Sequence, residues 1–314
     1  MSRFDLDKNA TFYIAGHSGM VGSAIWRTLE KKGFTNLVGR ASSDLDLRDR
    51  RAVFDFMLET KPRYVILAAA KVGGIYANDA NPVQFLSENL QIQVNVMDAA
   101  LDNDVERLVF LGSSCIYPKD APQPLKESYL LTGPLEHTND AYAIAKLAGI
   151  KHVQSVRKQY QKSWISVLPT NLYGPGDNYA KGESHVMAAL IRRFIEAKRD
   201  DLSSLTNWGT GNPLREFMHD DDLAEGVYLT LERYDDALPL NLGSGQEISI
   251  RDLSDLIQHL VGYRGKVIWD GSKPDGVSRK RLDLSRFPEI PARKIADGIR
   301  ETLGQLSHFD FQDS

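Results

Sequence analysis

The chain has very little cysteine, because Cys115 is the only cysteine among its 314 residues. A single cysteine excludes an internal disulfide. Chains without disulfides are typical of reducing compartments, so we expect a cytoplasmic protein. The residue lies in the stretch L-G-S-S-C-I-Y-P (Leu111 to Pro118). This stretch alone leaves two interpretations open, a small apolar filler at a strand end or an acid or base in an active site.

Long apolar runs and an excess of positive charge are also absent. No run of 18 apolar residues occurs, so we expect no membrane span. The first ten residues, M-S-R-F-D-L-D-K-N-A, carry charges where a secretory signal would have an apolar core. The formal net charge is -4, which gives no indication of a nucleic-acid partner. With 42% hydrophobic and 25% charged residues, the composition is that of a globular protein.

Short apolar segments alternate with helical patterns through the first half of the chain. The predicted strands cover 11–15, 36–40, 63–70, 107–114 and 164–169. The predicted helices cover the segment from the first glycine-rich loop to about Lys32, and then 51–60, 82–101 and 141–161. Strands that are apolar throughout are typical of a parallel sheet covered on both faces. We therefore predict an α/β fold with a doubly wound parallel sheet.

The pattern loosens after Gly176. We expect helices at 183–198, 221–233 and 250–261, and short strands at 216–220, 238–242 and 266–270, with a polar stretch at 199–207. These elements predict a Rossmann dinucleotide-binding domain over 1–176, to which 214–236 returns. Residues 177–213 and 237–314 are predicted to form a smaller substrate domain.

A glycine-rich loop, G-H-S-G-M-V-G, follows the first predicted strand and opens the first helix. Glycines allow a backbone to approach a pyrophosphate closely, and a helix N-terminus offers free N–H groups. The spacing G-x-x-G-x-x-G therefore predicts dinucleotide binding, and a tight turn without a ligand is the alternative. The expected cofactor-binding residues of the loop are Gly16, Ser18, Gly19, Met20, Val21 and Gly22.

The end of the second predicted strand bears on which dinucleotide binds. Arg40 comes first there, and a cation suits the 2′-phosphate of NADP, although a solvated surface charge is the alternative. Asp46 and Leu47 are placed to flank the adenine. Ala69 and Ala70, at the end of the third strand, leave room for the cofactor against the backbone. We therefore predict NADP as the cofactor.

Tyr142 and Lys146 form the motif Y-A-I-A-K. Residues at i and i+4 of a helix share one face, so the two side chains lie close together. A nearby ammonium favours the phenolate, and such a tyrosine exchanges a proton with a carbonyl oxygen. The motif is common by chance, but here it follows a strand that ends in Gly112-Ser113-Ser114. The hydroxyl of Ser113 would complete a Ser–Tyr–Lys set.

These motifs together resemble the extended short-chain dehydrogenase/reductase superfamily. Two further strings, P-T-N-L-Y-G-P from Pro169 and R-E-F-M-H-D-D-D from Arg215, are similar to its nucleotide-sugar enzymes. Longer strings narrow the resemblance to the GDP-L-fucose synthase family. They are A-A-A-K-V-G-G-I, L-G-S-S-C-I-Y-P, A-Y-A-I-A-K-L-A-G-I-K, S-H-V, N-W-G-T-G-N-P-L-R-E-F and S-K-P-D-G-V-S-R-K. The resemblance runs from about Thr11 to Asp283.

The resemblance implies an enzyme that epimerises carbons 3 and 5 of GDP-4-keto-6-deoxy-D-mannose and then reduces its 4-ketone with NADPH. The implied catalytic residues are Ser113, Cys115, Tyr142, Lys146 and His185. Cys115 and His185 would exchange the protons, since both have pKa values near neutrality. We hypothesise that Cys115 is the base and His185 the acid. A capping or solvated histidine is the alternative in E-S-H-V.

Binding residues are implied in the same way. The further cofactor contacts are Pro169, Asn171, Leu172 and His185, together with Tyr142 and Lys146. The implied substrate contacts are Ser113, Ser114, Asn171, Arg193, Trp208, Arg215, Asp275 and Lys280. Arg193 as a solvated residue and Trp208 as core are the alternatives. No metal is implied, and a homodimer is expected through the helices at 82–101 and 141–161.

The chain departs from the family pattern at two positions. Ser18 and Ser42 stand where relatives have arginines that we associate with the 2′-phosphate, so NADH use enters as an alternative to NADPH. The tail from Arg286 has no evident match.

Rival functions remain on the same scaffold. A 4,6-dehydratase would carry threonine and an acidic pair in place of Ser113-Ser114-Cys115. A 4-epimerase has no need of Cys115 with His185. A dinucleotide-binding sensor commonly lacks the tyrosine or the lysine.

Overall fold

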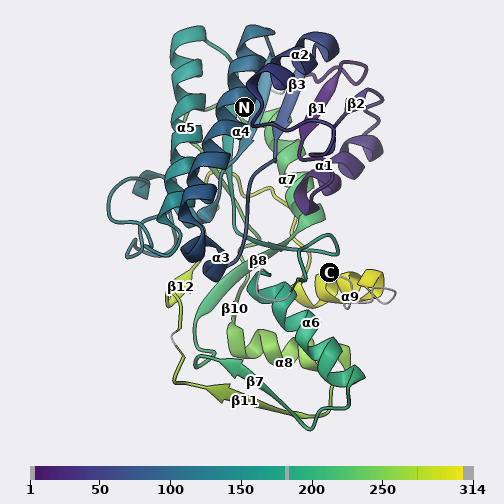
Figure 1. Cartoon of the computed structure of the whole chain (residues 1–314), viewed down its shortest axis with the longest axis vertical. Helices are drawn as coiled ribbons and strands as arrows, with labels where there is room; N and C mark the ends of the chain where they lie inside the picture. Colours follow the sequence, from purple (N-terminus) through teal and green to yellow (C-terminus); the bar gives the residue numbers. More distant parts are fainter. Residues whose placement is uncertain (1–3, 181–183, 274, 307–314) are drawn as a thin grey trace.

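The large sheet has six strands, all parallel, in the order β2-β1-β3-β4-β5-β9 (Figure 1). The computed structural model describes residues 4–180, 184–273 and 275–306. The strands are β1 (Phe12–Ala15), β2 (Leu37–Val38), β3 (Tyr64–Leu67), β4 (Arg107–Leu111), β5 (Ile165–Pro169) and β9 (Leu240–Leu242). The predicted fold class, a doubly wound parallel sheet, is confirmed.

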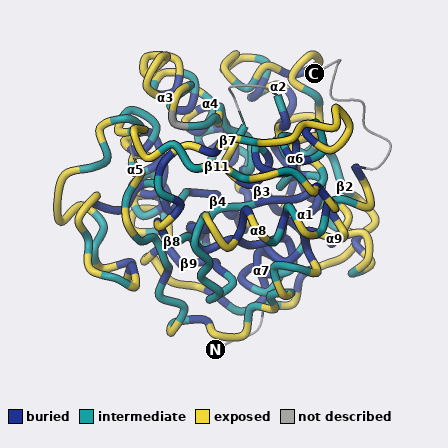
Figure 2. Tube along the Cα trace, turned by 90° about the horizontal axis from the view of Figure 1, so that it is seen from below, coloured by how far each residue is buried: buried dark blue, intermediate teal, exposed yellow. Residues whose placement is uncertain are grey.

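Helices cover both faces of this sheet. On one face lie α1 (Met20–Lys31) and α7 (Asp220–Arg233), and on the other lie α2 (Arg50–Thr60), α4 (Pro82–Asp102) and α5 (Asp140–Tyr160). Successive strand residues point to opposite faces. In β1, Tyr13 packs in the core under α2, α4 and α5, whereas Phe12 and Ile14 pack in the core under α1 and α7. Figure 2 shows the central strands β3 and β4 as buried.

The strand order reverses between β1 and β3. The chain leaves β1 for β2 on one side and then crosses to β3 on the other. Ligands of doubly wound sheets bind at the carboxyl ends of strands at such a switch point. The glycine-rich loop follows β1, and the segment that includes Ala69 and Ala70 follows β3, before the short helix α3 (Ile75–Ala80). The fold therefore brings both predicted cofactor segments to one place.

A second group of elements lies beyond the carboxyl ends of the large sheet, in the lower half of Figure 1. Its strands are β6 (Asn171–Tyr173), β8 (Leu214–His219), β10 (Glu247–Ser249) and β12 (Arg279–Lys280), with the separate pair β7 (Ser204–Trp208) and β11 (Lys266–Asp270). Its helices are α6 (Val186–Arg199), α8 (Ile250–Val261) and α9 (Ile295–Leu306). These helices share an apolar core of their own.

Several local predictions differ from the structure. The predicted strand at 107–114 ends at Leu111, because Ser113 caps a 3-10 turn, η1 (Ser114–Ile116). A second such turn, η2, covers Glu127–Tyr129. The polar stretch at 199–207 contains most of β7, whose side chains are largely exposed and so lack an apolar pattern. Five further elements have no counterpart among the predicted ones: α3, β6, β10, β12 and α9.

Other predictions are confirmed, and some concern residues that the structure does not describe. The expected ranges of α8 and β11 match the structure. The predicted start of a helix at Glu183, and Pro274 in the last family string, lie outside the described residues. So does the end of the tail, 307–314. Among the helices of the described ranges, none has both the length and the hydropathy that a bilayer crossing needs.

The sheets cross the predicted domain boundaries at three places. β6 falls in the range expected for the dinucleotide-binding domain, yet it pairs with β8 outside the large sheet. β9 falls in the range expected for the substrate domain, yet it pairs with β5 in the large sheet. β8 falls in the range expected to return to the first domain, yet it pairs with β10, β12 and β6. The helix α7 does pack against α1 on the large sheet. The two-domain division stays a prediction, with these three strands exchanged.

Candidate active site

The glycine-rich loop is packed so tightly that two of its residues have no room for a side chain. Gly16 has a φ of +86°, and a Cβ there would lie 2.7 Å from the Ala69 nitrogen. A Cβ on Gly22 would lie 2.0 Å from the Gly16 carbonyl oxygen. The loop therefore lies directly against the end of β3 and against the first turn of α1. This is the close backbone approach that a pyrophosphate cradle needs.

The N-terminus of α1 completes the cradle. Gly19 is the N-cap of this helix and gives its first N–H groups no side-chain partner. Such N–H groups and the positive end of the helix dipole favour an anion. Gly176 approaches this turn from the second group of elements, since a Cβ on it would lie 3.3 Å from the Met20 Cα. The observed loop fits the diphosphate of a dinucleotide.

The segment beyond β2 carries the residues expected at the adenosine. Arg40 is exposed, and its guanidinium donates to the Gly39 carbonyl 3.0 Å away and stacks over the Phe56 ring. Asp46 is also exposed and accepts from Arg48, which holds the pKa of its carboxyl below the usual value. Leu47 packs on the edge of the core. Ser18 and Ser42 are exposed as well.

The chain that leaves β3 is held by a residue that the sequence analysis missed. Asn89, buried in α4, accepts from the Lys71 N–H at 2.9 Å and donates to the Lys71 carbonyl at 3.0 Å. It also donates to the Phe85 carbonyl. These bonds fix the backbone directly after Ala69 and Ala70. The available signal was an amide four residues after Phe85, on a helix face that also buries the amide of Gln93.

Ser113, Cys115 and Tyr142 come together at the end of β4. The Ser113 hydroxyl accepts from the Cys115 N–H at 3.1 Å and also bonds to the Tyr142 hydroxyl. The charge of the Cys115 thiolate acts on the same phenol. Ser114, the first residue of the turn η1, is buried. The sequence predicts that the hydroxyls of Ser113 and Tyr142 and the thiol of Cys115 lie near one another. The structure places these three groups in contact.

Lys146 lies one turn after Tyr142 in α5, as expected, but its ammonium points elsewhere. Its Nζ donates to the Leu111 carbonyl at 2.8 Å and is 5.9 Å from the centre of the Tyr142 ring. Burial lowers the pKa of Lys146 to about 7. Burial, and then the Cys115 charge, raise the pKa of Tyr142 despite the bond to Ser113. The expectation that Lys146 lowers the pKa of this tyrosine is therefore wrong for this arrangement, because burial raises the pKa and the Lys146 ammonium is turned to the Leu111 carbonyl.

Lys280 is the cation nearest to Cys115, with 3.4 Å between Nζ and Sγ. Burial alone would raise the pKa of this thiol, but Lys280, Ser113 and Arg215 together bring it below its usual value. His185 is the N-cap of α6 and remains open to solvent on one side. Burial on its other sides, and then the Lys280 charge, lower the pKa of its imidazole. One ammonium thus acts on both predicted proton-transfer groups.

Arg215 and Lys280 lie side by side because β12 pairs in parallel with β8. Burial lowers the pKa of Arg215, and the Asp275 carboxylate partly offsets this. Asp275 itself accepts from the Thr210 N–H at 2.9 Å and from its hydroxyl at 2.6 Å. Two cations and one oriented carboxylate therefore belong to the second group of elements, where Figure 1 shows β8 and β12 below the large sheet.

The remaining predicted substrate contacts are set around these strands. Trp208 is 73% exposed, which excludes the alternative that it is core. Arg193 donates to the Asn207 amide oxygen at 3.0 Å and to the Thr206 carbonyl, so it is not simply solvated. Asn171 donates to the Glu216 carbonyl at 2.8 Å. Pro169 and Leu172 flank it in β5 and β6.

Glu216 is a second residue that the sequence analysis missed. It is completely buried, and its carboxylate accepts from the N–H groups of Gly245 and Leu282, each at 2.8 Å. Burial raises its pKa. The carboxylate thus ties the segment that carries Lys280 to β8. The sequence feature that could have indicated this role is an acidic residue beside Arg215 within an apolar strand.

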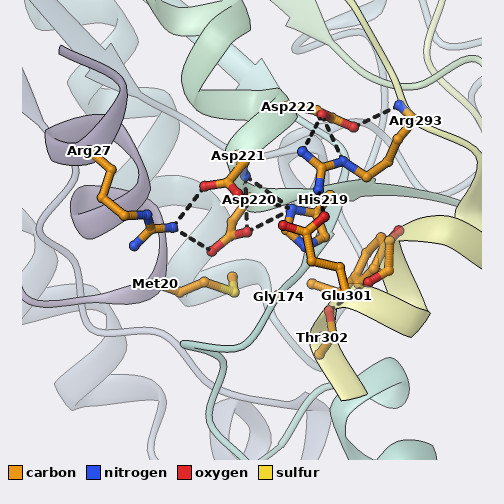
Figure 3. Close-up of polar contacts among 12 residues, drawn as sticks. Met20, Arg27, Gly174, His219, Asp220, Asp221, Asp222, Arg293, Glu301 and Thr302 are labelled. Carbon is orange, nitrogen blue, oxygen red and sulfur yellow. Dashed lines mark hydrogen bonds and ion pairs between the residues drawn. The ribbon is translucent and has the colours of Figure 1, made fainter. Parts of the chain in front are cut away.

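The N-terminus of α7 carries a polar cluster outside this site (Figure 3). His219, Asp220 and Asp221 have the residue types of a metal site, and their ligand atoms lie within 4.8 Å of one another. Arg27 of α1 already bonds to Asp221 at 2.7 Å and pairs with Asp220 at 3.8 Å. The His219 ring and a backbone N–H contact the other Asp220 oxygen. The cluster therefore joins α1 to α7 as an ion-pair network.

Comparisons with known proteins agree with this geometry. Residues 12–243 match the NAD dependent epimerase/dehydratase family. GDP-L-fucose synthase 1 of Arabidopsis thaliana is 52% identical over 94% of this chain and 93% of its own length. GDP-L-fucose synthase of Escherichia coli is 49% identical over 88% of this chain and 89% of its own. A crystal structure of a GDP-L-fucose synthetase from Naegleria fowleri bound to NADP has a TM-score of 0.89 at 26% identity, covering 98% of this chain and 96% of that one. The chain therefore belongs to the NAD dependent epimerase/dehydratase family and, within it, to the GDP-L-fucose synthase family.

Proposed function

We propose that this chain converts GDP-4-keto-6-deoxy-D-mannose to GDP-L-fucose by epimerisation at carbons 3 and 5 and NADPH-dependent reduction at carbon 4. The observation that carries the proposal is the grouping of Cys115 with Ser113 and Tyr142 at the end of β4, beside Lys280. A reductase needs the tyrosine and the serine, but an epimerase also needs a base. Relatives about half identical to this chain carry the name GDP-L-fucose synthase.

Epimerisation removes a proton from a carbon next to the ketone. The C–H electron pair moves into an enolate, whose oxygen is stabilised by aimed donors. The hydroxyls of Tyr142 and Ser113 provide these donors. Cys115 accepts the proton on one face as thiolate, and His185 returns a proton on the other face. The lowered pKa of the thiol supports Cys115 as the base.

Reduction uses the same donors. When bound, NADPH supplies the hydride that reaches carbon 4. Tyr142 gives its proton to the ketone oxygen as the alcohol forms, and a raised pKa keeps this phenol protonated until then. The Lys146 ammonium lies one helical turn away, where it holds the nicotinamide ribose. The glycine-rich loop between Gly16 and Gly22 holds the pyrophosphate.

The GDP part of the substrate lies toward β8 and β12. Arg193, Arg215 and Lys280 provide the cations for its diphosphate, and the Asp275 carboxylate favours the charged form of Arg215. The exposed indole of Trp208 offers a flat face to the base or ribose. Asn171, at the junction of both sheets, holds the sugar. The substrate thus spans from the second group of elements to the end of β4.

NADPH is the proposed cofactor, although two expected arginines are serines. Arg40 is the exposed cation at the end of β2, where a 2′-phosphate would lie. Ser18 and Ser42 supply hydroxyls but no charge. We therefore propose that NADPH is preferred over NADH by a smaller ratio than in relatives with arginines at these positions.

The proposed assembly is a homodimer through α4 and α5. These two long helices pack side by side on one face of the large sheet. They expose four large apolar residues to solvent: Val83, Val94, Ile144 and Tyr160. A partner copy would cover these side chains. The proposed location is the cytoplasm, where the single, partly accessible cysteine stays reduced.

The test is a direct assay. Purified protein is mixed with GDP-4-keto-6-deoxy-D-mannose in deuterium oxide, with NADPH, with NADH, or with neither. We expect nicotinamide oxidation with NADPH and deuterium at carbons 3 and 5. Deuterium without oxidation would mean an epimerase that lacks the hydride step. Neither signal would contradict the proposal and favour a dehydratase, a 4-epimerase or a sensor.

A further inference from the structure

The position of Lys280 is fixed by the backbone on both of its sides. Arg279 pairs with Leu214, and Lys280 pairs with Arg215, in the parallel register of β12 and β8. Two residues later, the Leu282 N–H is held by the buried Glu216 carboxylate at 2.8 Å. Because the backbone is held on both sides of Lys280, its Cα cannot slide along the strand.

The side chain of Lys280 ends against Cys115. Its Nζ is 3.4 Å from Sγ, although 165 residues separate the two along the chain. The other groups that face the thiol are the Ser113 hydroxyl, the Tyr142 phenol and the Arg215 guanidinium. The two charged side chains within the described residues that act on it, Lys280 and Arg215, are both cations. Such surroundings favour a thiolate over a thiol.

We propose that Lys280 is a positioning residue for epimerisation, which keeps Cys115 ionised as the base, in addition to any contact with the substrate diphosphate. The inference rests on the proposed function, because it explains why Cys115, the base of that reaction, carries a negative charge. An ammonium has three donors on one compact cation. It can therefore donate to the thiolate and to a phosphate oxygen at the same time. Substrate anchoring and base ionisation would then share one residue.

The proton transfer balances without another reactant. The thiolate forms an S–H bond as the sugar C–H bond breaks, and the electron pair of that bond moves onto the ketone oxygen as an enolate. Lys280 keeps its three protons throughout. His185 then supplies a proton to the carbon from the opposite face, and the thiol returns its own proton to solvent. No group is oxidised or reduced.

Titration of the thiol tests the inference without any substrate. Cys115 is the only cysteine, so thiolate absorbance and the rate of iodoacetamide alkylation both report on it alone. We would measure both against pH in the full chain and in Lys280→Met, Lys280→Arg and Lys273→Met, with Cys115→Ser as the blank. Lys273 is a matched control, because it is an exposed lysine of the turn after β11, near Trp208.

The inference predicts a thiol midpoint below the ordinary value of about 8.5 in the unsubstituted protein. It predicts a rise of about 1–3 pH units in Lys280→Met, since that is the usual effect of a close opposite charge. In Lys280→Arg the thiol midpoint should stay partly lowered. In Lys273→Met it should equal the midpoint of the unsubstituted protein. A midpoint of 8.5 or more in the unsubstituted chain, or no rise in a folded Lys280→Met, would overturn it. Circular dichroism and NADPH binding check that the variants fold.

A second readout separates this inference from the proposed function. The pH profile of deuterium entry at carbons 3 and 5 should move to higher pH in Lys280→Met, whereas loss of a diphosphate contact alone would raise KM and leave the profile in place. If the unsubstituted chain turns over no 4-keto sugar, the proposed function fails while the thiol titration still decides the Lys280 pairing. If it turns over the sugar and the titration is unmoved, only the role of Lys280 is wrong.

Discussion

Gly22 lies directly on the Gly16 carbonyl, so close that a Cβ on Gly22 would be 2.0 Å from the Gly16 oxygen. We expect Gly22→Ala to push the loop away from α1 and to cost about 1–3 kcal/mol of folding free energy, the usual cost of overpacking. The same shift moves the N–H groups that face the pyrophosphate. NADPH affinity, measured by fluorescence titration, should fall at least tenfold.

Gly271→Ala is the control for that prediction. A Cβ at this turn position meets nothing within 4 Å. Its melting temperature and NADPH affinity should match those of the unsubstituted protein. An unchanged NADPH affinity in Gly22→Ala would mean that the loop does not hold the cofactor.

Ser42→Arg should increase the preference for NADPH over NADH. Ser42 is exposed and follows Arg40 by two residues, so an added guanidinium can reach the same 2′-phosphate. A hydrogen bond to a charged group contributes about 1.5–3 kcal/mol, which corresponds to roughly ten- to a hundredfold in affinity. The ratio of kcat/KM with the two cofactors measures this. Ser43→Arg, at the next exposed position, should change the ratio much less.

Much of the cofactor side could be predicted from the sequence because its signals are local. The glycine spacing between Gly16 and Gly22 follows from one strand–turn–helix unit. The spacing of Tyr142 and Lys146 follows from one helix. The alternation of short apolar segments with helical patterns was enough to predict the parallel sheet. In each case the physical reason lies within a few neighbouring residues.

The contacts that join distant segments could not be read in this way. No pattern along the chain places Lys280 against Cys115, since the contact depends on a two-residue strand whose register is set by β8. Glu216 acts through a carboxylate that is buried only after the strands meet. The pKa of Tyr142 was predicted in the wrong direction, because spacing gives the neighbouring cation but not the degree of burial.

Glu216→Gln should loosen the segment that carries Lys280. An amide keeps one acceptor oxygen but turns N–H groups toward the N–H donor of Gly245 or Leu282. A buried donor left without a partner costs about 1–3 kcal/mol, so the free energy of unfolding in urea should fall by that amount. The KM for the nucleotide sugar should rise while NADPH binding is unchanged. Glu289→Gln, at an exposed residue paired with Arg233, is the control and should change neither.

Lys146→Met should stabilise the protein near neutral pH while removing the reductase activity. Burial lowers the pKa of Lys146 from the usual 10.5 to about 7 in the folded chain. Below pH 7 both the folded and the unfolded chain carry this proton, so the folded chain bears the full cost of the buried charge. Between about 7 and 10.5 only the unfolded chain is protonated here, so stability rises with pH.

The variant removes this dependence, and with it one hydrogen bond to Leu111, which is worth about 1 kcal/mol. The gain in melting temperature should therefore be largest at pH 6 to 7 and shrink toward pH 10. A gain that is equal at both ends would mean that Lys146 titrates normally. Lys151→Met, at an exposed position of α5, should show no such trend.

Epimerisation should show a bell-shaped pH profile whose two limbs belong to Cys115 and His185. The base works as thiolate, so its limb rises with pH, and Lys280 places that rise below the ordinary thiol pKa. The acid works as imidazolium, so its limb falls with pH, and burial together with Lys280 places that fall below the ordinary histidine pKa. The maximum should lie between the two values, where both groups are only partly in their active forms.

The variants test the assignment of each limb. In Cys115→Ser, deuterium entry should drop by about 10²–10⁴, the usual contribution of a positioned acid or base, and the rising limb should disappear. In His185→Asn, the falling limb should disappear, because an amide does not titrate. Full deuterium entry in Cys115→Ser would mean that another group removes the protons. If each variant instead removes the limb assigned to the other, the roles of base and acid are exchanged, and the lone cysteine of this chain is the proton donor.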